Sequence, residues 1–348
     1  MIVTYLRSSS IGSLSMCEHS YYLKYVLGLE DSTGKSAVLG NMLHKTEEML
    51  AKGKLLHQQT GKTGGWDIGD EYVGEFIPND IYDNKILTPL CKLAYDYYKT
   101  TCDLDFDDKD LIKVIGWANT VAKYQNGAYD PRSHQIEYAE KFFDFEIKQD
   151  WAKYEYQLGD KTLTGYLGIK GTIDLIMRLD NNTLEILDYK TGSNKDWATM
   201  KDKDLKSLHK DPQLLLYYYA CRNIFPEIKH FVFTIYYLAT AGPFTLVFDD
   251  DSYKLAEKMI RNKFEQIKGI THPKLISNTQ QERSKNFKCS KLCHFAKHNQ
   301  PGTDITICEY YQNKVKESNA DLVMLEYGNL KKLTEYQDGG GRKADTKD

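Results

Sequence analysis

Two aspartates and a lysine stand in neighbouring apolar segments of this 348-residue chain. Asp174 lies in the run Gly-Thr-Ile-Asp-Leu-Ile-Met-Arg-Leu, and Asp188 and Lys190 end the run Thr-Leu-Glu-Ile-Leu-Asp-Tyr-Lys. Both runs have strand-like composition, and the intervening residues 180–182, Asp-Asn-Asn, are typical of a turn, so the pattern predicts a β-hairpin. Carboxylates are the ligands that hard divalent cations prefer, and a nearby lysine can orient water or neutralise developing negative charge. These residue types therefore indicate metal-dependent phosphodiester hydrolysis.

The register of this hairpin decides whether the two aspartates meet. Asp188 and Lys190 are two residues apart and share one face of their strand, while Tyr189 points to the other face. A two-residue loop would pair Asp174 with Tyr189 and place the carboxylates on opposite faces, whereas a three-residue loop would pair Asp174 with Asp188. A metal site therefore requires the three-residue loop or a β-bulge. The alternative is an ordinary hairpin with solvated charges at its edge.

A histidine and two glutamates stand one helical turn apart upstream of the hairpin. Residues 40–48 read Gly-Asn-Met-Leu-His-Lys-Thr-Glu-Glu, within a helix that we expect over residues 37–52. His44 therefore shares a helix face with an acid. Neutral imidazole is a good ligand for Mn²⁺ and an acceptable companion to carboxylates around Mg²⁺. A buried histidine with a packing role would have the same spacing.

A further polar pair lies in a helix that we expect over residues 211–224. The helix begins with Asp-Pro, which is typical of a helix N-terminus. Gln213 and Tyr217 are four residues apart and lie on one stripe of this helix. Their side chains could hydrogen-bond a phosphate or hold Lys190 in place. A stripe of interface residues would look the same.

The seven cysteines divide into two sets. Cys289, Cys293 and Cys308 lie in one basic segment with spacings of three and fourteen residues, and Cys17 lies near the start of the chain. Clustered cysteines in a cytosolic chain suggest metal rather than disulfides, so these four could hold an iron–sulfur cluster or zinc. Such a site would join distant parts of the chain, and the alternative is four unrelated buried thiols. The other cysteines lie in helical patterns and suit packing: Cys91, Cys102 and Cys221.

Composition restricts the partners of the chain. A net charge of −3 excludes a polycation that coats nucleic acid, so any DNA contact must come from local patches. Two lysine-rich segments, 195–210 and 283–297, offer such patches, although both could be simple solvated faces. The sequence has neither the long apolar run of a membrane span nor the apolar stretch of a signal peptide. We therefore expect a cytoplasmic protein.

The periodicity of the sequence predicts helices first, then antiparallel strands, then further helices and strands. Helices are expected within 1–30 and 84–126 and over 251–270, with a glycine-rich loop over 53–80. Strands are expected over 135–147, 154–158, 162–179, 184–190, 229–238 and 243–248. A charged tail from Asp338 is expected to be disordered. The order indicates an α/β or α+β sheet with helical elaborations and not a doubly wound parallel sheet.

Taken together, these segments resemble the RecB-like branch of the PD-(D/E)XK nuclease superfamily. Within that branch they are most similar to the iron–sulfur-containing CRISPR-associated RecB-like exonucleases and to AddB-type nuclease domains. The resemblance covers about residues 8–310. Its motifs, in the order of the family, are residues 8–29 with Cys17, residues 40–48 with His44, Glu137 or Glu140 in a strand, Gly171-x-x-Asp174, Asp188-Tyr189-Lys190-Thr191-Gly192, and Gln213-x3-Tyr217.

The resemblance implies a restriction-endonuclease-like core, a mixed central sheet flanked by helices. The parts of the chain would be a helical N-terminal part (1–130), the nuclease core (131–275), a cysteine-bearing segment that packs back on the N-terminus (276–318) and a partly disordered tail (319–348). The metal ligands would be His44, Asp174, Asp188 and the carbonyl oxygen of Tyr189. The catalytic group would be Lys190, Asp174, Asp188, Gln213 and Tyr217. Lys190 would position the attacking water.

The same resemblance implies a [4Fe-4S] cluster held by Cys17, Cys289, Cys293 and Cys308. The family usually has a tight pair of cysteines with a third a few residues later, whereas the spacings here are three and fourteen. Zinc therefore stays an alternative, and His294 or His298 could replace one thiolate.

The implied activity is that of a Mg²⁺- or Mn²⁺-dependent deoxyribonuclease, an exonuclease on single-stranded or frayed DNA ends in repair or recombination. Besides DNA, its partner would be a helicase or recombination protein, in a bacterial or phage-infected cell. One other class is a non-catalytic DNA-binding or scaffold subunit of a larger recombination or replication complex. Another is a zinc-stapled RNA-processing factor.

Overall fold

A six-stranded mixed sheet forms the centre of the computed structural model, which describes residues 1–64, 66–70, 74–76, 80–195, 201–239, 242–277 and 279–329. The strand order is β1-β7-β8-β9-β10, and β4 also pairs with β7. The strands are β1 (Tyr5–Leu6), β4 (Gln135–Glu146), β7 (Gly168–Asp180), β8 (Thr183–Lys190), β9 (His230–Tyr237) and β10 (Gly242–Phe248). Pairing is parallel for β1–β7 and β8–β9 and antiparallel elsewhere in this sheet. The mixed sheet with its helices confirms the expected fold class.

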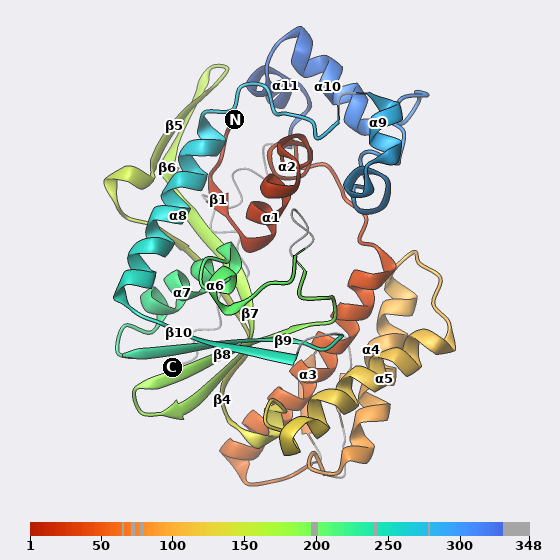
Figure 1. Ribbon diagram of the computed structural model, residues 1–348, viewed down its shortest axis with the longest axis vertical. Helices are drawn as coiled ribbons and strands as arrows, with labels where there is room; N and C mark the ends of the chain where they lie inside the picture. Colours follow the sequence, from red (N-terminus) through yellow and green to blue (C-terminus); the bar gives the residue numbers. More distant parts are fainter. Residues whose placement is uncertain are drawn as a thin grey trace.

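Helices cover both faces of the sheet (Figure 1). On one face, α7 (Pro212–Ile224), α8 (Asp250–Lys268) and α1 (Ser8–Met16) share a large core with the strands. On the other face, α3 (Lys35–Thr60) and α5 (Asp108–Lys123) cover the sheet. Successive residues of β8 serve the two cores in turn, since Ile186 packs in the first and Leu187 in the second. Both faces of β8 are therefore buried.

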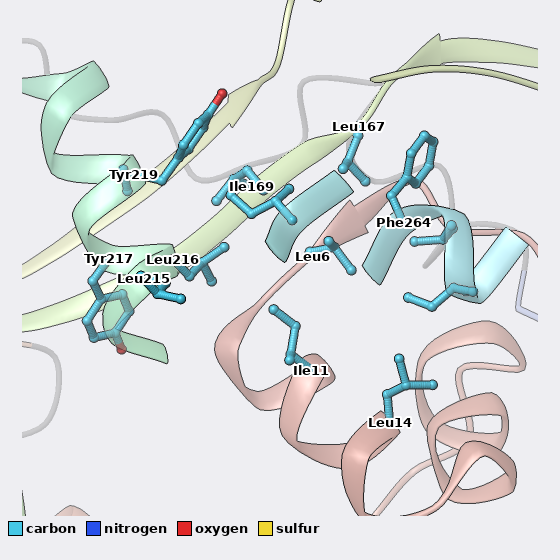
Figure 2. Packing of buried hydrophobic residues seen from close by; sticks show 14 of the residues in the cluster. Leu6, Ile11, Leu14, Leu167, Ile169, Leu215, Leu216, Tyr217, Tyr219 and Phe264 are labelled. Atoms are coloured by element: carbon cyan, nitrogen blue, oxygen red, sulfur yellow. The ribbon is translucent and has the colours of Figure 1, made fainter. Parts of the chain in front are cut away.

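The larger core fixes β7 relative to α7. Figure 2 shows Ile169 of β7 beside Leu216 of α7, with Leu6 and Ile11 of the N-terminal segment approaching from the other side. All four side chains are buried. Burying a side chain of this size stabilises the fold by roughly 1.5–3 kcal/mol. The strand that carries Asp174 is thereby held against the helix that carries the Gln213–Tyr217 pair.

A separate layer of helices extends beyond the sheet. α4 (Leu87–Thr101) packs against α3 and α5 around its own buried core, and 3-10 turns at Asn84–Ile86, Tyr124–Asn126 and Pro131–Ser133 flank these helices. Leu43 of α3 and Leu90 of α4 are both buried in this core. α4 consequently lies beside the turn of α3 that bears His44.

The N-terminal segment packs against the last described part of the chain (Figure 1). The helical elements concerned are α2 (Glu18–Tyr21), a π-helical turn (Tyr22–Val26), α9 (Gln280–Lys285), a π-helical turn (Lys288–Leu292), α10 (Ile307–Glu317) and α11 (Ala320–Tyr327). The His19 Nε2 atom lies 2.9 Å from the carbonyl oxygen of Cys308, and the Tyr22 hydroxyl donates to the Ala320 carbonyl at 2.8 Å. Two segments almost 300 residues apart are thus joined by buried hydrogen bonds.

The structure differs from the sequence-based expectations at two places. The expected loop over 53–80 begins with the last turns of α3, because good helix formers after Gly53 outweigh the single glycine, and contains a small pair of strands, β2 (Trp66–Asp70) and β3 (Gly74–Phe76). The strand expected over 162–179 is divided at Leu167 into β6 (Lys161–Tyr166) and β7. β6 forms a separate hairpin with β5 (Lys153–Leu158).

The end of the described chain carries one more helix. Helix α11 lies within residues 319–348, for which a partly disordered tail is expected from the sequence. The tail expected from Asp338 lies outside the described residues. The described residues also contain two short helical pieces, a 3-10 turn at Asp150–Ala152 and α6 (Leu205–Leu208). No helix in the described part of the chain is long and apolar enough to cross a membrane.

Candidate active site

A β-bulge sets the register of the hairpin formed by β7 and β8. Leu175 pairs with Leu187 and Arg178 with Leu184, but Asp180 pairs with Thr183, so the register shifts by one residue at Leu179. The turn itself has only two residues, and the bulge supplies the odd residue that a metal site requires. Continuing the inner register by one step places Asp174 opposite Asp188. The two carboxylates therefore lie on the same face of the sheet.

Helix α3 brings His44 to this face. The Nδ1 atom of His44 lies 3.1 Å from Oδ2 of Asp174. Gly40, one turn earlier, allows the approach, because a Cβ atom at this position would lie 3.0 Å from Oγ1 of Thr191, directly after β8. Gly40 thus allows α3 to lie close to the end of β8, and His44 on the same helix then contacts Asp174.

Glu140 of β4 completes a group of three possible metal ligands. Its neighbours Ala139 and Lys141 pair with Leu175 and Ile173, so Glu140 lies beside Asp174. One ligand atom each of His44, Glu140 and Asp174 lie within 4.8 Å of one another. Glu140 has a backbone φ of 50°, which is unusual for a residue with a Cβ and typical of positions held by a functional site.

Glu137, the other acid that the sequence left open, lies elsewhere. Its carboxylate accepts a hydrogen bond from Nε of Arg178 at 2.7 Å. It therefore forms a surface ion pair near the turn end of the hairpin. Strand spacing alone did not distinguish Glu137 from Glu140, because the register of β4 also shifts, between Ile136 and Tyr138.

A hydrogen-bonded chain connects Asp188 to helix α7. Nζ of Lys190 lies 2.9 Å and 2.7 Å from the two carboxylate oxygens of Asp188. Nε2 of Gln213 donates to Asp188 at 2.9 Å and to the Tyr217 hydroxyl at 3.3 Å. Asp211 caps the helix by accepting from the Gln213 backbone N–H. The structure thus places Gln213 and Tyr217 beside the Asp188–Lys190 pair, with Gln213 bonded to the carboxylate rather than to the lysine.

Charges in this buried group shift one another's proton affinities. Burial would lower the pKa of His44, but the carboxylates of Asp174 and Asp188 raise it to about 9. Burial and the neighbouring Asp174 and Glu48 raise the pKa of Glu140 to about 8. Burial acts to raise the pKa of Asp174, yet His44 and Lys190 lower it overall. Without metal, protons on His44 and Glu140 therefore offset the carboxylate charge at neutral pH.

The second carboxylate and the lysine respond differently. Burial raises the pKa of Asp188 although Lys190 opposes the shift. Burial would lower the pKa of Lys190, but Asp188 and Asp174 raise it above its ordinary value. In the metal-free protein Lys190 is therefore charged at neutral pH, and its ammonium group donates to Asp188.

The residues present fit a divalent cation. Oδ2 of Asp174 and Oδ2 of Asp188 are buried and make ion-pair contacts but no well-aligned hydrogen bond, so each keeps acceptor capacity. Together with Glu140 and one imidazole nitrogen they form the oxygen-rich set that suits Mg²⁺ or Mn²⁺. The side chain of Tyr189 points away from them, and its hydroxyl donates to the Tyr129 carbonyl at 2.6 Å.

A cleft of about 370 Å³ opens onto this group. We call it the active-site cleft; its lining residues are Asn41, His44, Lys45, Glu48, Tyr98, Glu140 and Asp174. Sequence analysis did not identify Asn41, Lys45 or Tyr98. The position of Lys45 directly after His44 could have indicated that it lies near the site. Nothing in the sequence linked Tyr98 of α4 to this site.

The cysteines expected to ligate a cluster also come together. Cys17, Cys289, Cys293 and Cys308 line one cavity, together with the buried Arg283. Burial raises the pKa of Cys289 to about 11 and that of Cys308 to about 12. Burial therefore favours the protonated thiols at neutral pH, as in packed cysteines, and a metal centre would have to displace these protons.

The histidines considered as substitutes lie outside this cavity lining. Nδ1 of His294 lies 2.6 Å from the Ser32 hydroxyl, and its ring stacks on that of His298 with centroids 4.2 Å apart. Of the two lysine-rich segments, 283–297 keeps Lys285, Lys291 and Lys297 exposed, whereas Arg283 is buried against Glu309 at 3.0 Å.

The chain belongs to the PD-(D/E)XK nuclease superfamily, whose sequence profile matches residues 8–297. Metal-dependent nuclease chemistry is the activity of this class. Among solved structures, the crystal structure of SSO0001 is similar with 13% identity, 74% of this chain and 94% of that chain covered, and a TM-score of 0.24. No curated protein matches the chain. The RecB-like branch and the iron–sulfur likeness stay predictions.

Proposed function

We propose that this protein is a Mg²⁺- or Mn²⁺-dependent DNA exonuclease that hydrolyses single-stranded or frayed DNA ends. The observation that carries the proposal is the grouping of His44, Glu140 and Asp174 within 4.8 Å beside the Asp188–Lys190 pair. A degenerate family member that only binds DNA would not need to keep buried carboxylates, an imidazole and a lysine together against their mutual desolvation cost.

The metal would be held by His44, Glu140, Asp174, Asp188 and the carbonyl of Tyr189. When bound, a divalent cation polarises a phosphate oxygen and lowers the pKa of a water molecule. His44 must lose its proton to become a ligand, which the raised pKa of His44 makes pH-dependent. Nδ1 of His44 lies 3.1 Å from Oδ2 of Asp174, so once this nitrogen has lost its proton the two atoms would hold the same ion.

Lys190 would contact the reacting phosphate and the attacking water. Its ammonium group, held by Asp188, can donate to water and to a phosphate oxygen, and its charge offsets the negative charge that develops during displacement. Gln213 and Tyr217 would act as positioning residues, because Gln213 fixes the carboxylate oxygen that in turn holds Lys190.

The cysteine cavity would hold a [4Fe-4S] cluster with a structural role. No three of the four sulfur atoms lie within 4.8 Å of one another in the described structure. A tetrahedral zinc site with Zn–S bonds of roughly 2.3 Å would bring its sulfur atoms to roughly 3.8 Å apart. Either group would therefore require the four sulfur atoms to rearrange on binding, and the proposal of a cluster rests on the family resemblance, with zinc as the alternative.

The test is cleavage of end-labelled single-stranded and double-stranded DNA by anaerobically purified protein, with and without Mn²⁺. We expect metal-dependent degradation of single strands and frayed ends, and loss of cleavage in Asp174→Ala with an unchanged circular dichroism spectrum. Retained cleavage by this variant would remove the proposal. Folded wild-type protein that binds DNA but never cleaves it would instead support a scaffold subunit.

A further inference from the structure

The active-site cleft contains more than the hydrolytic group. Asn41, Lys45 and Glu48 lie at positions i, i+4 and i+7 of α3 and form one stripe along the cleft. Tyr98 reaches the same cleft from α4. None of these four residues belongs to the group that we propose to hold the metal and position the attacking water. Their position next to Glu140 and Asp174 places them where the part of the substrate beside the scissile phosphate must lie.

Lys45 is a buried positive charge in a cleft otherwise rich in carboxylates. Its side chain is only 7% exposed, and its ammonium group lies 3.0 Å from Glu48. Glu48 is also paired with Lys52 at 2.6 Å, so its negative charge is shared between two lysines. An ammonium group held at this place suits a phosphate oxygen of the substrate.

Tyr98 supplies an aromatic surface to the same space. Its ring is half-buried and is supported by the ring of Tyr97, whose centroid lies 5.1 Å away in an edge-on arrangement. Aromatic side chains in nucleic-acid grooves stack on any base, because every base has a π-face. The cleft volume of about 370 Å³ lies near the lower end of the range of ligand pockets, roughly 300–1,000 Å³. This space suits one unpaired nucleotide better than a base pair.

We propose that Asn41, Lys45 and Tyr98 form a subsite for one unpaired nucleotide next to the scissile phosphate. Tyr98 stacks on its base, Lys45 binds its phosphate, and the Asn41 amide hydrogen-bonds the sugar or base. The inference rests on the proposed nuclease function and deepens it. A base can reach Tyr98 only when it is unpaired, so this subsite makes the enzyme selective for single strands without sequence preference.

Tyr98 is tested by a double-mutant cycle in which one change is made in the protein and the other in the DNA substrate. Wild type, Tyr98→Ala and Tyr98→Phe are assayed on single-stranded oligonucleotides that carry one abasic residue at successive positions. We expect Tyr98→Ala to lower kcat/KM on intact DNA by roughly 5- to 150-fold, the equivalent of one base-stacking interaction, and Tyr98→Phe to match wild type. At one abasic position the difference between wild type and Tyr98→Ala should disappear.

Two outcomes overturn the Tyr98 assignment. Equal losses on intact DNA and on every abasic substrate would show that the ring only supports the fold, and no loss at all would show that no base contacts it. Tyr82→Ala is the matched control, since Tyr82 is an exposed tyrosine whose ring packs on Lys54 and His57. If wild type cleaves no DNA, the proposed function fails, and the same cycle measured as oligonucleotide binding in Ca²⁺ decides the subsite separately.

Lys45 is tested by the salt dependence of binding. Lys45→Gln should weaken single-strand binding and reduce the slope of log K against log salt by roughly 0.7, as expected for one lost phosphate contact. Lys52→Gln is the matched control, because it also removes one ion pair with Glu48 but does not line the cleft. Equal slopes for the two variants would overturn the phosphate contact.

Discussion

The carboxylate site and the cysteine cavity are built in opposite ways. Asp174, Asp188 and Glu140 sit on adjacent strands of one sheet, so backbone pairing fixes their spacing. The cysteines come from two distant segments, Cys17 directly after α1 and the other three between residues 289 and 308, which are joined by hydrogen bonds and by packed side chains. Backbone pairing therefore fixes the first site directly, whereas we propose that the second is completed by the group that binds there.

Because of this difference, we expect substitutions at the two sites to affect different properties, the cleavage rate and the stability of the fold. A site on paired strands can lose its metal and keep its shape, because β7 and β8 are buried on both faces. A site that joins distant segments contributes binding free energy directly to folding. Changes at the carboxylate site should therefore affect cleavage far more than stability, and changes at the cysteine cavity should do the reverse.

The largest effect is expected from Glu140→Gln compared with Glu137→Gln. Both replace an acid on β4, but only Glu140 lies beside Asp174, while Glu137 pairs with Arg178 at 2.7 Å. Loss of a metal-holding carboxylate should lower kcat/KM by about 10²-fold or more, and the control should stay within about twofold of wild type. Single-turnover cleavage with saturating Mn²⁺ measures both. Similar rates for the two variants would remove Glu140 from the site.

A second effect is expected from Cys308→Ser compared with Cys102→Ser. Losing a ligand of a structural cluster should destabilise the protein by at least about 2 kcal/mol, which lowers Tm by at least about 3 °C in a chain of 348 residues. Visible absorption should disappear while cleavage at 25 °C stays within about threefold of wild type. Thermal unfolding followed by circular dichroism, together with the absorption spectrum, measures the change. Equal Tm values for the two variants would make the four cysteines ordinary packing residues.

The sequence predicted the fold class, and it identified most of the residues that the structure brings together in the candidate site, because both depend on local patterns. Alternating apolar residues and an Asp-Asn-Asn turn were sufficient to locate the hairpin of Asp174 and Asp188. The bulge at Leu179 was not predictable in position, since bulges depend on how a strand packs against the rest of the sheet. The same limit left Glu137 and Glu140 undecided.

Tyr98 shows a different limit. Its place in the cleft depends on how α4 packs against α3, which is a tertiary contact between segments with no shared motif. Periodicity identified the helix but did not indicate which side of it meets the site. Residues that bind the substrate around a catalytic group are therefore harder to find from sequence than the catalytic group itself.

Metal binding should release protons in a pH-dependent way. At pH 7 both His44 and Glu140 carry protons in the metal-free protein, because their pKa values are raised to about 9 and about 8. Ligation removes these protons, so Mn²⁺ affinity should rise with pH up to about 9, and about two protons should be released per ion at pH 7. Titration calorimetry in buffers of different ionisation enthalpy counts the protons. Glu140→Gln should release about one proton fewer, and a pH-independent affinity would contradict both assignments.

The pKa shifts also predict how pH affects the metal-free protein. A group whose pKa is raised by folding stabilises the protein fully below its unfolded pKa and loses that contribution as pH rises through its folded pKa. For His44 the window runs from 6.5 to about 9, and for Glu140 from 4.5 to about 8. The metal-free protein should therefore have a lower Tm at pH 9 than at pH 6.5, and Mn²⁺ should reduce this difference. A Tm of the metal-free protein that rises between pH 6.5 and pH 9 would contradict the upward pKa shifts of His44 and Glu140.

The smallest effect should come from Gly40→Ala, and it should separate stability from metal affinity. Alanine is the better helix former by about 0.8–1 kcal/mol, so the substitution should leave Tm unchanged or slightly raised. Its Cβ atom, however, would lie 3.0 Å from Oγ1 of Thr191, so this contact must open by a few tenths of an ångström, and we expect α3 to take part in the shift and to carry His44 with it. Mn²⁺ affinity should then fall by less than about tenfold.

The partner of this contact provides the control for Gly40→Ala. Thr191→Ala removes the oxygen that the new Cβ atom would meet, so the double variant Gly40→Ala/Thr191→Ala should regain the Mn²⁺ affinity of Thr191→Ala alone. Calorimetric affinities of the four proteins give the coupling between the two positions. If the effects of the two substitutions on Mn²⁺ affinity are additive, Gly40 does not act through its contact with Thr191. The position of His44 must then be fixed by other contacts.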